Sequence, residues 1–197
     1  MMKEPLLIGI TGGIGSGKSV VSKLLKHYAV PVYDSDKEAK RLMNDDSQIR
    51  TQLTLLFGRE LYRNNTLNRK LLADLIFHDT QKLQQVNSLV HPIVTRDFIA
   101  WAHRQNTPVA AIESAILFEA GLDKTVSFTI QVTAPLEERI KRVMIRDHAD
   151  REAVIARIQN QMDDTKQAEL ADIVIQNDTH HSLLLQVENL MTVLAKK

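Results

Sequence analysis

Apolar residues along the chain gather in five short runs, each about as long as a β-strand. Between the runs, apolar residues recur every three or four positions, as Val21, Leu24 and Leu25 do after Lys18. A continuous apolar run predicts a strand buried on both faces, and helical spacing between such strands predicts helices covering a parallel sheet. The sequence therefore predicts an α/β fold in three layers, with a five-stranded parallel sheet in the middle. The predicted strands span residues 6–10, 30–33, 109–112, 128–132 and 172–175.

Three predicted helices carry recognisable signals. Ser35 and Glu38 have the spacing of a capping box, with Ser35 as the N-cap residue and Glu38 three positions later. Pro135 suits the first turn of a helix that runs to about Asp147. Residues 182–195 have the amphipathic pattern of a closing helix.

The middle of the chain, about residues 46–104, shows helical patterns and no convincing strand. It includes the pair His91-Pro92, where a proline is expected to kink or break a helix. An all-helical stretch inside an α/β frame indicates an inserted helical subdomain. We expect a single domain over residues 1–197, with a core at about 1–45 and 105–197.

Composition excludes several classes of protein. The 197 residues are 44% hydrophobic and 25% charged, as in a globular protein, and the net charge of +1 gives no global field for nucleic acid. Cysteine is absent, which excludes disulfides and thiolate chemistry, and the seven histidines lack metal-ligand spacing. The apolar stretch near the start is too short for a signal peptide or a membrane span. We expect a soluble cytoplasmic protein that binds neither nucleic acid nor membranes, as a monomer or weak homo-oligomer.

The strongest chemical signal follows the first predicted strand. Residues 12–19, Gly-Gly-Ile-Gly-Ser-Gly-Lys-Ser, fit the P-loop pattern G-x-x-x-x-G-K-[ST] between a strand and a helix. Glycines let successive backbone N–H groups face one anion, and the helix adds its positive dipole end. Lys18 is expected to reach the β- and γ-phosphates, and Ser19 to donate an oxygen to Mg²⁺. An empty glycine-rich turn is the alternative, and this combination of residues and context disfavours it.

Acidic residues follow two further predicted strands. Because carboxyl ends of parallel strands meet at one edge, Asp34, Glu113 and the P-loop should face one crevice. Asp34 has little local structural purpose, which favours a chemical role. Asp36 lies in a first helical turn, where an acid is stabilising by itself. Glu113 is a candidate for the shell around the metal, with a plain loop acid as the alternative.

Arginines form a row on one later helix. Arg139, Arg142 and Arg146 stand at i, i+3 and i+7, with Arg151 just beyond. Beside a phosphate site, Arg142 and Arg146 suit contacts to a triphosphate. For Arg139 we expect a solvated position, paired locally with neighbouring acids.

What the P-loop does not decide is how the nucleotide is used. The guanine signatures N-K-x-D and D-x-x-G are absent, which argues against a guanine-nucleotide switch. At this length, and with a helical insertion, a small-molecule kinase is favoured. The alternatives are another nucleoside or nucleotide kinase, and a regulatory P-loop module that hydrolyses slowly and signals to a partner.

Beyond the P-loop, the sequence resembles the dephospho-coenzyme A kinases over nearly its whole length. The matching blocks are residues 10–19, Asp34-Ser35-Asp36, His91-Pro92, residues 117–122, Arg142 to Asp147, Ala171-Asp172 and Asn177. Departures are modest: Val20, Lys40 and Ala115 replace frequent family residues, and Glu113 stands where an aspartate is common. The longer Glu113 side chain changes how its carboxylate reaches the waters of the metal.

The resemblance implies a P-loop kinase fold like that of nucleoside monophosphate kinases. It also implies ATP-dependent phosphorylation of the 3′-hydroxyl of dephospho-CoA, the last step of coenzyme A synthesis, with ATP and Mg²⁺ as cofactors. Residues 46–104 are then expected to bind the acceptor and residues 147–165 to form a lid. The implied catalytic residues are Lys18, Asp34 and Arg142. ATP would be bound by Gly13, Ile14, Gly15, Ser16, Gly17, Lys18, Ser19, Val20, Arg142 and Arg146. The acceptor would be bound by Asp34, Asp36, His91 and Glu119, and the metal by Ser19 and Glu113.

Overall fold

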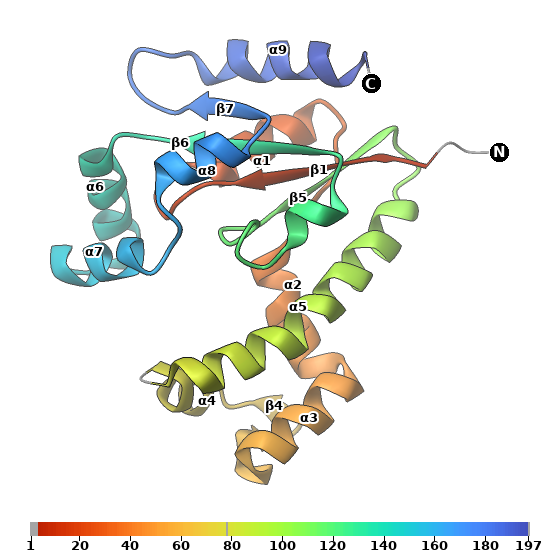
Figure 1. Cartoon of the computed structure of the whole chain (residues 1–197), viewed down its shortest axis with the longest axis vertical. Helices are drawn as coiled ribbons and strands as arrows, with labels where there is room; N and C mark the ends of the chain where they lie inside the picture. Colours follow the sequence, from red (N-terminus) through yellow and green to blue (C-terminus); the bar gives the residue numbers. More distant parts are fainter. Residues whose placement is uncertain (1–3, 78, 197) are drawn as a thin grey trace. The chain divides into compact units, whose positions relative to one another are not determined.

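The computed structural model describes residues 4–77 and 79–196, and the chain divides into two compact units (Figure 1). One unit consists of the chain up to Asp34 and from Trp101 onward, and the other is Ser35–Ala100. The second unit thus starts earlier than the predicted boundary near residue 46. The helix after Asp34 belongs to it because that helix packs on the next one and its Arg41 pairs with Asp97, with Nη2 and Oδ2 2.8 Å apart.

The first unit is built on the predicted five-stranded parallel sheet. Its strand order is β2-β5-β1-β6-β7, and every neighbouring pair is parallel. Both faces of the central strands are buried, as continuous apolar runs require. The fold class predicted from the sequence is confirmed. The strands are β1 (Leu6–Thr11), β2 (Val32–Asp34), β5 (Val109–Glu113), β6 (Phe128–Thr133) and β7 (Ile173–Gln176).

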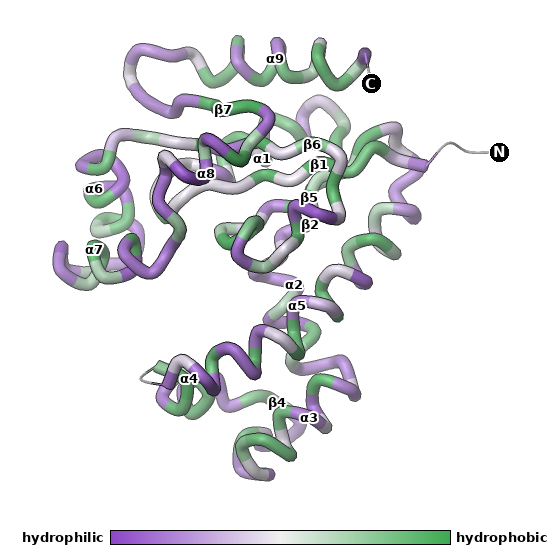
Figure 2. Tube along the Cα trace, in the orientation of Figure 1, coloured by the Kyte–Doolittle hydropathy of each residue, from purple (hydrophilic) through white to green (hydrophobic). Residues whose placement is uncertain are grey.

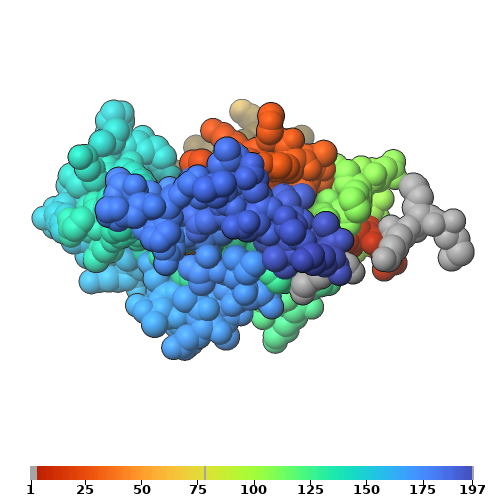
Figure 3. Space-filling model, turned by 90° about the horizontal axis from the view of Figure 1, so that it is seen from above, coloured from red at the N-terminus to blue at the C-terminus, as the bar shows by residue number. Residues whose placement is uncertain are grey.

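Helices cover the two faces of this sheet. On one face, Ile8 and Ile130 pack with α1 and α9 in one buried cluster that includes Leu25 and Leu190. Figure 2 shows hydrophobic and hydrophilic positions mixed along α9, and Figure 3 shows α9 at the surface as the dark blue segment. On the other face, α8 lies against β6 and contributes the buried Gln167. The helices are α1 (Lys18–His27), α6 (Leu136–Asp147), α7 (Arg151–Gln159), α8 (Asp164–Leu170) and α9 (Leu183–Leu194), with the short η2 (Leu122–Thr125).

The second unit is helical, as predicted, but it also contains a small hairpin. Strands β3 (Tyr62–Arg63) and β4 (Thr66–Leu67) pair antiparallel across Asn64 and Asn65, both with positive φ. The expectation that this region has no strand was wrong, because two-residue strands are too short to produce an apolar run. The other elements are α2 (Ser35–Asp45), α3 (Ser47–Phe57), η1 (Arg59–Leu61), α4 (Arg69–Phe77) and α5 (Thr80–His103), whose last turn lies in the first unit.

Helix α5 continues through Pro92, the proline that was expected to kink or break it. Pro92 lies inside the helix and is exposed, while Ile93 and Val94 beside it are buried. An internal proline costs about 3 kcal/mol, and burying each aliphatic side chain contributes roughly 1.5–3 kcal/mol. Burial of the two side chains therefore outweighs the proline, and of the two outcomes expected there, a break does not occur.

At the start of α2, Ser35 is the first helical residue rather than the predicted N-cap residue. The helix begins at Ser35 itself, directly after β2 ends at Asp34. The Glu38 carboxylate accepts a hydrogen bond from Arg41 Nε at 2.5 Å, one turn further along the helix. The remaining helix ends follow the pattern, with Pro135 and Ser182 at the N-cap positions of α6 and α9. No helix in the described part of the chain is long and apolar enough to cross a membrane.

Candidate active site

The loop between β1 and α1 has a backbone that only glycine accepts at several positions. Gly12, Gly15 and Gly17 have φ values of 141°, 79° and 98°. A Cβ atom on Gly12 would lie 2.1 Å from the carbonyl oxygen of Val132, at the end of β6. One on Gly17 would lie 2.0 Å from the amide nitrogen of Asn177. Because the loop is packed this closely from outside, its inner side is formed by main chain, which suits an anion.

Lys18 closes this loop from the first turn of α1. Its Nζ donates to the carbonyl oxygens of Gly12 and Gly13 at 2.6 and 3.2 Å. Gly17 is the N-cap residue of α1 and has no side chain to cap the helix, and Ser19 and Val20 beside it are exposed. A lysine, an exposed hydroxyl and a helix N-terminus therefore meet in one turn, as the P-loop pattern predicts.

Arg142 reaches the loop, as its assignment to ATP binding requires. Its Nη1 donates to the carbonyl oxygen of Gly15 at 3.4 Å, and its Nη2 donates to Asn177 O and Glu138 Oε2 at 3.1 and 2.8 Å. Asn177 in turn donates from Nδ2 to the carbonyl oxygen of Ser16 at 2.7 Å. Arg142 and Asn177 thus support the loop at two consecutive carbonyls.

The expectation for Arg139 was wrong. Its side chain is only 3% exposed, and its partner is Asp164 at the start of α8 rather than a neighbour on its own helix. Its Nε donates to the carbonyl oxygen of Ile14 at 3.0 Å. Helical spacing places Arg139 on the face that it shares with Arg142, but it does not predict that α6 packs this end against the loop.

Arg146 lies one turn beyond Arg142 and points to an acid of its own helix. It forms two hydrogen bonds with Asp147, at 2.7 and 3.0 Å, and Arg157 also donates to Asp147 at 2.8 Å. These bonds lower the pKa of Asp147, first through Arg146, and raise the pKa of Arg146. Its role in ATP binding stays a prediction.

The acidic residues end neighbouring strands at one level of the sheet. Ile10 is in register with Glu113, and Glu113 is in register with Asp34. In a parallel pair, residues in register point to the same face of the sheet, so the two carboxylates are neighbours at the edge where β1 enters the P-loop. Asp34 is exposed and Glu113 is half-buried. Two acids thus end the strands beside the one that leads into the phosphate loop.

The described residues form no self-contained metal site at this edge. Among the described residues, no three or more His, Cys, Asp or Glu side chains are grouped so that they could hold a metal ion. Ser19 and Glu113, the two predicted metal contacts, supply one hydroxyl and one carboxylate. That donor set is too small for a dedicated protein site, but it suits Mg²⁺, which retains waters and binds through substrate phosphates.

Glu119 makes a contact that the sequence did not predict. Its Oε1 accepts a hydrogen bond from the backbone N–H of Met162 at 3.0 Å, so it fastens the segment between α7 and α8. The neighbouring Gln161 was not predicted as a site residue, yet its Oε1 accepts from the N–H of Ile14 at 2.7 Å. A lone glutamine in a polar segment carries no spacing signal that could have singled it out.

Asp36 and His91 lie in the helical unit. Asp36 is exposed in the first turn of α2, and His91 is half-buried in α5. Burial lowers the pKa of His91, which favours its neutral form. Their roles in acceptor binding stay predictions.

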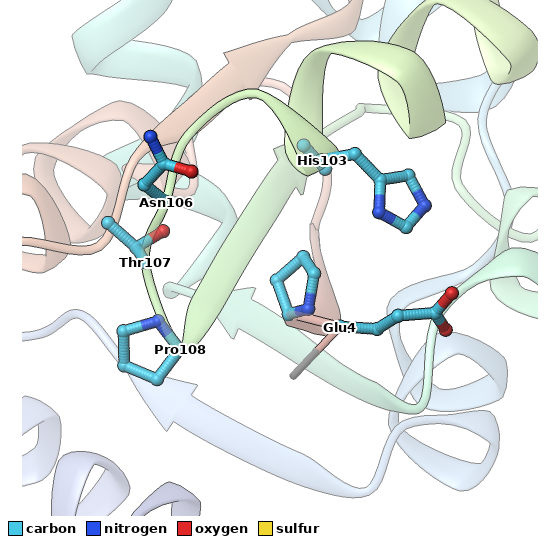
Figure 4. A pocket seen from close by; sticks show the side chains of 7 residues that line it. Glu4, His103, Asn106, Thr107 and Pro108 are labelled. Carbon is cyan, nitrogen blue, oxygen red and sulfur yellow. The ribbon is translucent and has the colours of Figure 1, made fainter. Parts of the chain in front are cut away.

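A separate pocket of about 350 Å³ opens at the amino ends of the strands (Figure 4). Figure 4 shows Glu4, His103 and Asn106 around it, with Thr107 and Pro108 just before β5. None of the predicted site residues lines this pocket. In parallel sheets, ligands bind at the carboxyl ends of the strands, so the chemistry belongs to the opposite edge.

Comparison with known proteins decides between the classes of P-loop protein. The family model described as dephospho-CoA kinase matches residues 6–182. The chain belongs to the dephospho-CoA kinase family. This membership makes it a kinase that uses ATP to phosphorylate dephospho-CoA, a reaction of coenzyme A biosynthesis.

Relatives of known name and structure extend over the same length. The dephospho-CoA kinase of Bacteroides fragilis strain YCH46 is 43% identical over 96% of this chain and 93% of the relative. That of Porphyromonas gingivalis is 41% identical over 98% and 96%. The crystal structure of TT1252 from Thermus thermophilus superposes with a TM-score of 0.84 at 38% identity, covering 98% of both chains. The family resemblance and the fold are therefore confirmed over nearly the whole chain.

Proposed function

We propose that this kinase transfers the γ-phosphoryl group of ATP to the 3′-hydroxyl of the dephospho-CoA ribose, giving coenzyme A and ADP. The observation that carries the proposal is the register of the strand ends at the carboxyl edge of the sheet. There, Asp34 and Glu113 stand in register beside the strand that leads into the P-loop. An acidic pair next to a phosphate loop provides one place for a triphosphate and one for the hydroxyl that attacks it.

The loop fits a triphosphate. Its glycine backbone is held from outside by β6, Arg139 and Asn177, so the N–H groups need little reorganisation when the phosphates bind. Lys18 now donates to loop carbonyls and would turn its ammonium toward the β- and γ-phosphates. Arg142, bonded to the Gly15 carbonyl, would neutralise charge on the same phosphates. We assign the remaining ATP contacts to residues 13–20 and Arg146.

Ser19 and Glu113 would hold Mg²⁺ together with phosphate oxygens and water. The exposed Ser19 hydroxyl offers a direct ligand, and the Glu113 carboxylate is a partner for coordinated water. When bound, the ion neutralises the negative charge of the transferring group.

Asp34 would orient the acceptor hydroxyl and receive its proton. As the new bond to phosphorus forms, the ribose hydroxyl proton moves to the carboxylate, and the β-phosphate of ADP leaves from the opposite side. A strand-end position holds the carboxylate more firmly than a loop would, and this suits a group that aims another. Asp36, His91 and Glu119 are the proposed acceptor contacts, residues 46–104 the acceptor-binding region and residues 147–165 the lid.

An acceptor panel tests the proposal. The purified kinase is mixed with ATP and Mg²⁺, and with dephospho-CoA, AMP, CMP or no acceptor, and ADP formation is followed. We expect ADP to form rapidly only with dephospho-CoA, and Lys18→Ala to lower this rate by orders of magnitude while the fold stays intact. Preference for AMP or CMP would identify a different nucleotide kinase, and equal ADP release without acceptor would identify a regulatory nucleotide hydrolase.

A further inference from the structure

The two peptide groups on either side of Ile14 are both held by side chains from distant parts of the chain. The Ile14 N–H donates to Gln161 Oε1 at 2.7 Å, and the Ile14 carbonyl accepts from Arg139 Nε at 3.0 Å. Ile14 lies in the middle of the phosphate loop, with Gly13 before it and Gly15 after it. Glycines on both sides make this stretch able to rotate, so a fixed orientation has to come from outside the loop.

Arg139 is itself fixed in the protein interior. It is only 3% exposed, and its Nη1 pairs with the carboxylate of the half-buried Asp164. The carbonyl of Asp164 accepts from the buried Gln131 at 2.7 Å. The ion pair holds the guanidinium in place, because removing Asp164 would leave the charge of Arg139 buried and unpaired.

The segment that carries Gln161 is fastened from a second direction. The N–H of Met162 donates to Glu119 Oε1, and the Met162 carbonyl accepts from the buried Gln167 at 3.2 Å. The glutamine therefore stands on a short piece of chain bonded on both sides, rather than on a free loop tip. Such support is what a group needs to position another group within a fraction of an ångström.

Arg139 also lies directly against the loop backbone. A Cβ atom on Gly13 would be 1.9 Å from Arg139 Nη2, so the guanidinium occupies the space beside the Gly13 Cα. Its positive charge is placed behind the loop that the phosphates are proposed to occupy.

We propose that Gln161 and Arg139 are positioning residues for phosphoryl transfer, which fix the peptides around Ile14 and so preorganise the phosphate loop for ATP. The inference rests on the proposed use of this loop for ATP. The proposed role of Gln161 and Arg139 differs from that of Lys18 and Arg142. Gln161 and Arg139 act only through the loop backbone, whereas Lys18 and Arg142 are proposed to contact the phosphates. A loop that must find its orientation after ATP arrives loses part of its binding energy, so the effect falls on ATP rather than on the acceptor.

Gln161→Met is the variant that tests this, because methionine keeps the length of the side chain and removes its carbonyl acceptor. The matched control is Gln176→Met, at an exposed position at the end of β7 and outside the proposed lid. The KM for ATP, the KM for dephospho-CoA, kcat and the melting temperature are measured for both. We expect Gln161→Met to raise the KM for ATP roughly tenfold, the effect of one lost hydrogen bond, with the KM for dephospho-CoA unchanged. Gln176→Met should match the parent in all four.

The outcomes separate this inference from the proposed function. A lower melting temperature with both KM values unchanged would show a purely structural role for Gln161 and overturn the inference. A decrease in the KM for ATP would also overturn it, since Gln161 would then compete with the nucleotide for the Ile14 N–H. Lys18→Ala is measured in parallel, and near-normal turnover in that variant would instead contradict the use of the loop for ATP.

Arg139→Lys gives a second, independent test where it folds. Lysine keeps the charge but is a point donor, so it does not serve the Ile14 carbonyl and Asp164 in the fork geometry of arginine. We expect the same selective increase in the KM for ATP, and an unchanged KM for ATP in a folded Arg139→Lys protein would contradict a positioning role for Arg139.

Discussion

Asp34 and Asp36 stand two residues apart in the sequence but belong to different parts of the fold. Asp34 ends β2 in register with Glu113, whereas Asp36 lies in the first turn of α2, inside the helical unit. An acid in a first helical turn is stabilised by the helix dipole whether or not it does chemistry. The proposed mechanism therefore places the proton transfer on Asp34 alone.

Asp34→Asn keeps the size of the side chain and removes the basic carboxylate. We expect kcat to fall by roughly a hundredfold or more, the usual range for loss of a general base, with ATP affinity little changed. Asp36→Asn should cost much less turnover and lower the melting temperature slightly. If Asp36→Asn is inactive and Asp34→Asn turns over normally, the two roles are assigned the wrong way round.

At this scale the sequence singled out candidate residues but not every contact between side chains. Lys18 and Asp34 are candidates because a motif and a strand end mark them. Arg139 was expected to be solvated, because helical spacing gives the face of a helix and not the depth at which that face packs. Gln161 carries no pattern at all, and only the folded chain brings it to Ile14.

Two glycines with positive φ, Gly12 in the P-loop and Gly121 before η2, are required for different reasons that stability measurements separate. Gly12 has positive φ, and a Cβ there would collide with the Val132 carbonyl at 2.1 Å. Gly121 also has positive φ, but nothing lies within 4 Å of its Cβ position. We expect Gly121→Ala to cost about 1 kcal/mol of unfolding free energy, from backbone strain alone. Gly12→Ala should cost about 3 kcal/mol or more, because main chain must also move.

Urea unfolding of the two glycine variants beside the parent measures this difference. Equal losses in Gly12→Ala and Gly121→Ala would mean that the close approach of β6 to the loop contributes nothing to the arrangement of this element.

Helix α5 gives the helical unit a predicted pH dependence through His91. Burial lowers the pKa of His91 in the folded chain, so the unfolded chain binds this proton more readily. The free energy of unfolding therefore decreases as the pH falls through the ordinary pKa of histidine. Above that pH, the contribution of neutral His91 to stability is fully retained. Between about pH 7.5 and about pH 5.5 the melting temperature should fall, and it should fall less in His91→Gln.

His103→Gln is the control, since His103 is exposed in the last turn of the same helix. A melting curve of His91→Gln that follows the parent at every pH would show that His91 is protonated equally in the folded and unfolded chains.

For the molecule as a whole, the periodicity of apolar residues was enough to predict the sheet. It was not enough to predict where one compact unit ends and the other begins. The five apolar runs form five parallel strands, because a strand that is buried on both faces of a sheet has apolar residues at successive positions. The unit boundary was placed near residue 46, whereas it lies at Ser35, because a helix that directly follows a strand has no sequence signal for the unit on which it packs. The β3–β4 hairpin was missed because its strands have two residues each.

The product formed from ATP, Mg²⁺ and dephospho-CoA tests the central claim most directly. Mass and phosphorus resonance spectra of the purified product show how many phosphates were added and to which oxygen. The proposed site, with Asp34 aiming one ribose hydroxyl at the P-loop, predicts coenzyme A with the new phosphate on the 3′-oxygen and one ADP for each coenzyme A. Phosphate on another oxygen, or ADP formed without coenzyme A, would contradict it.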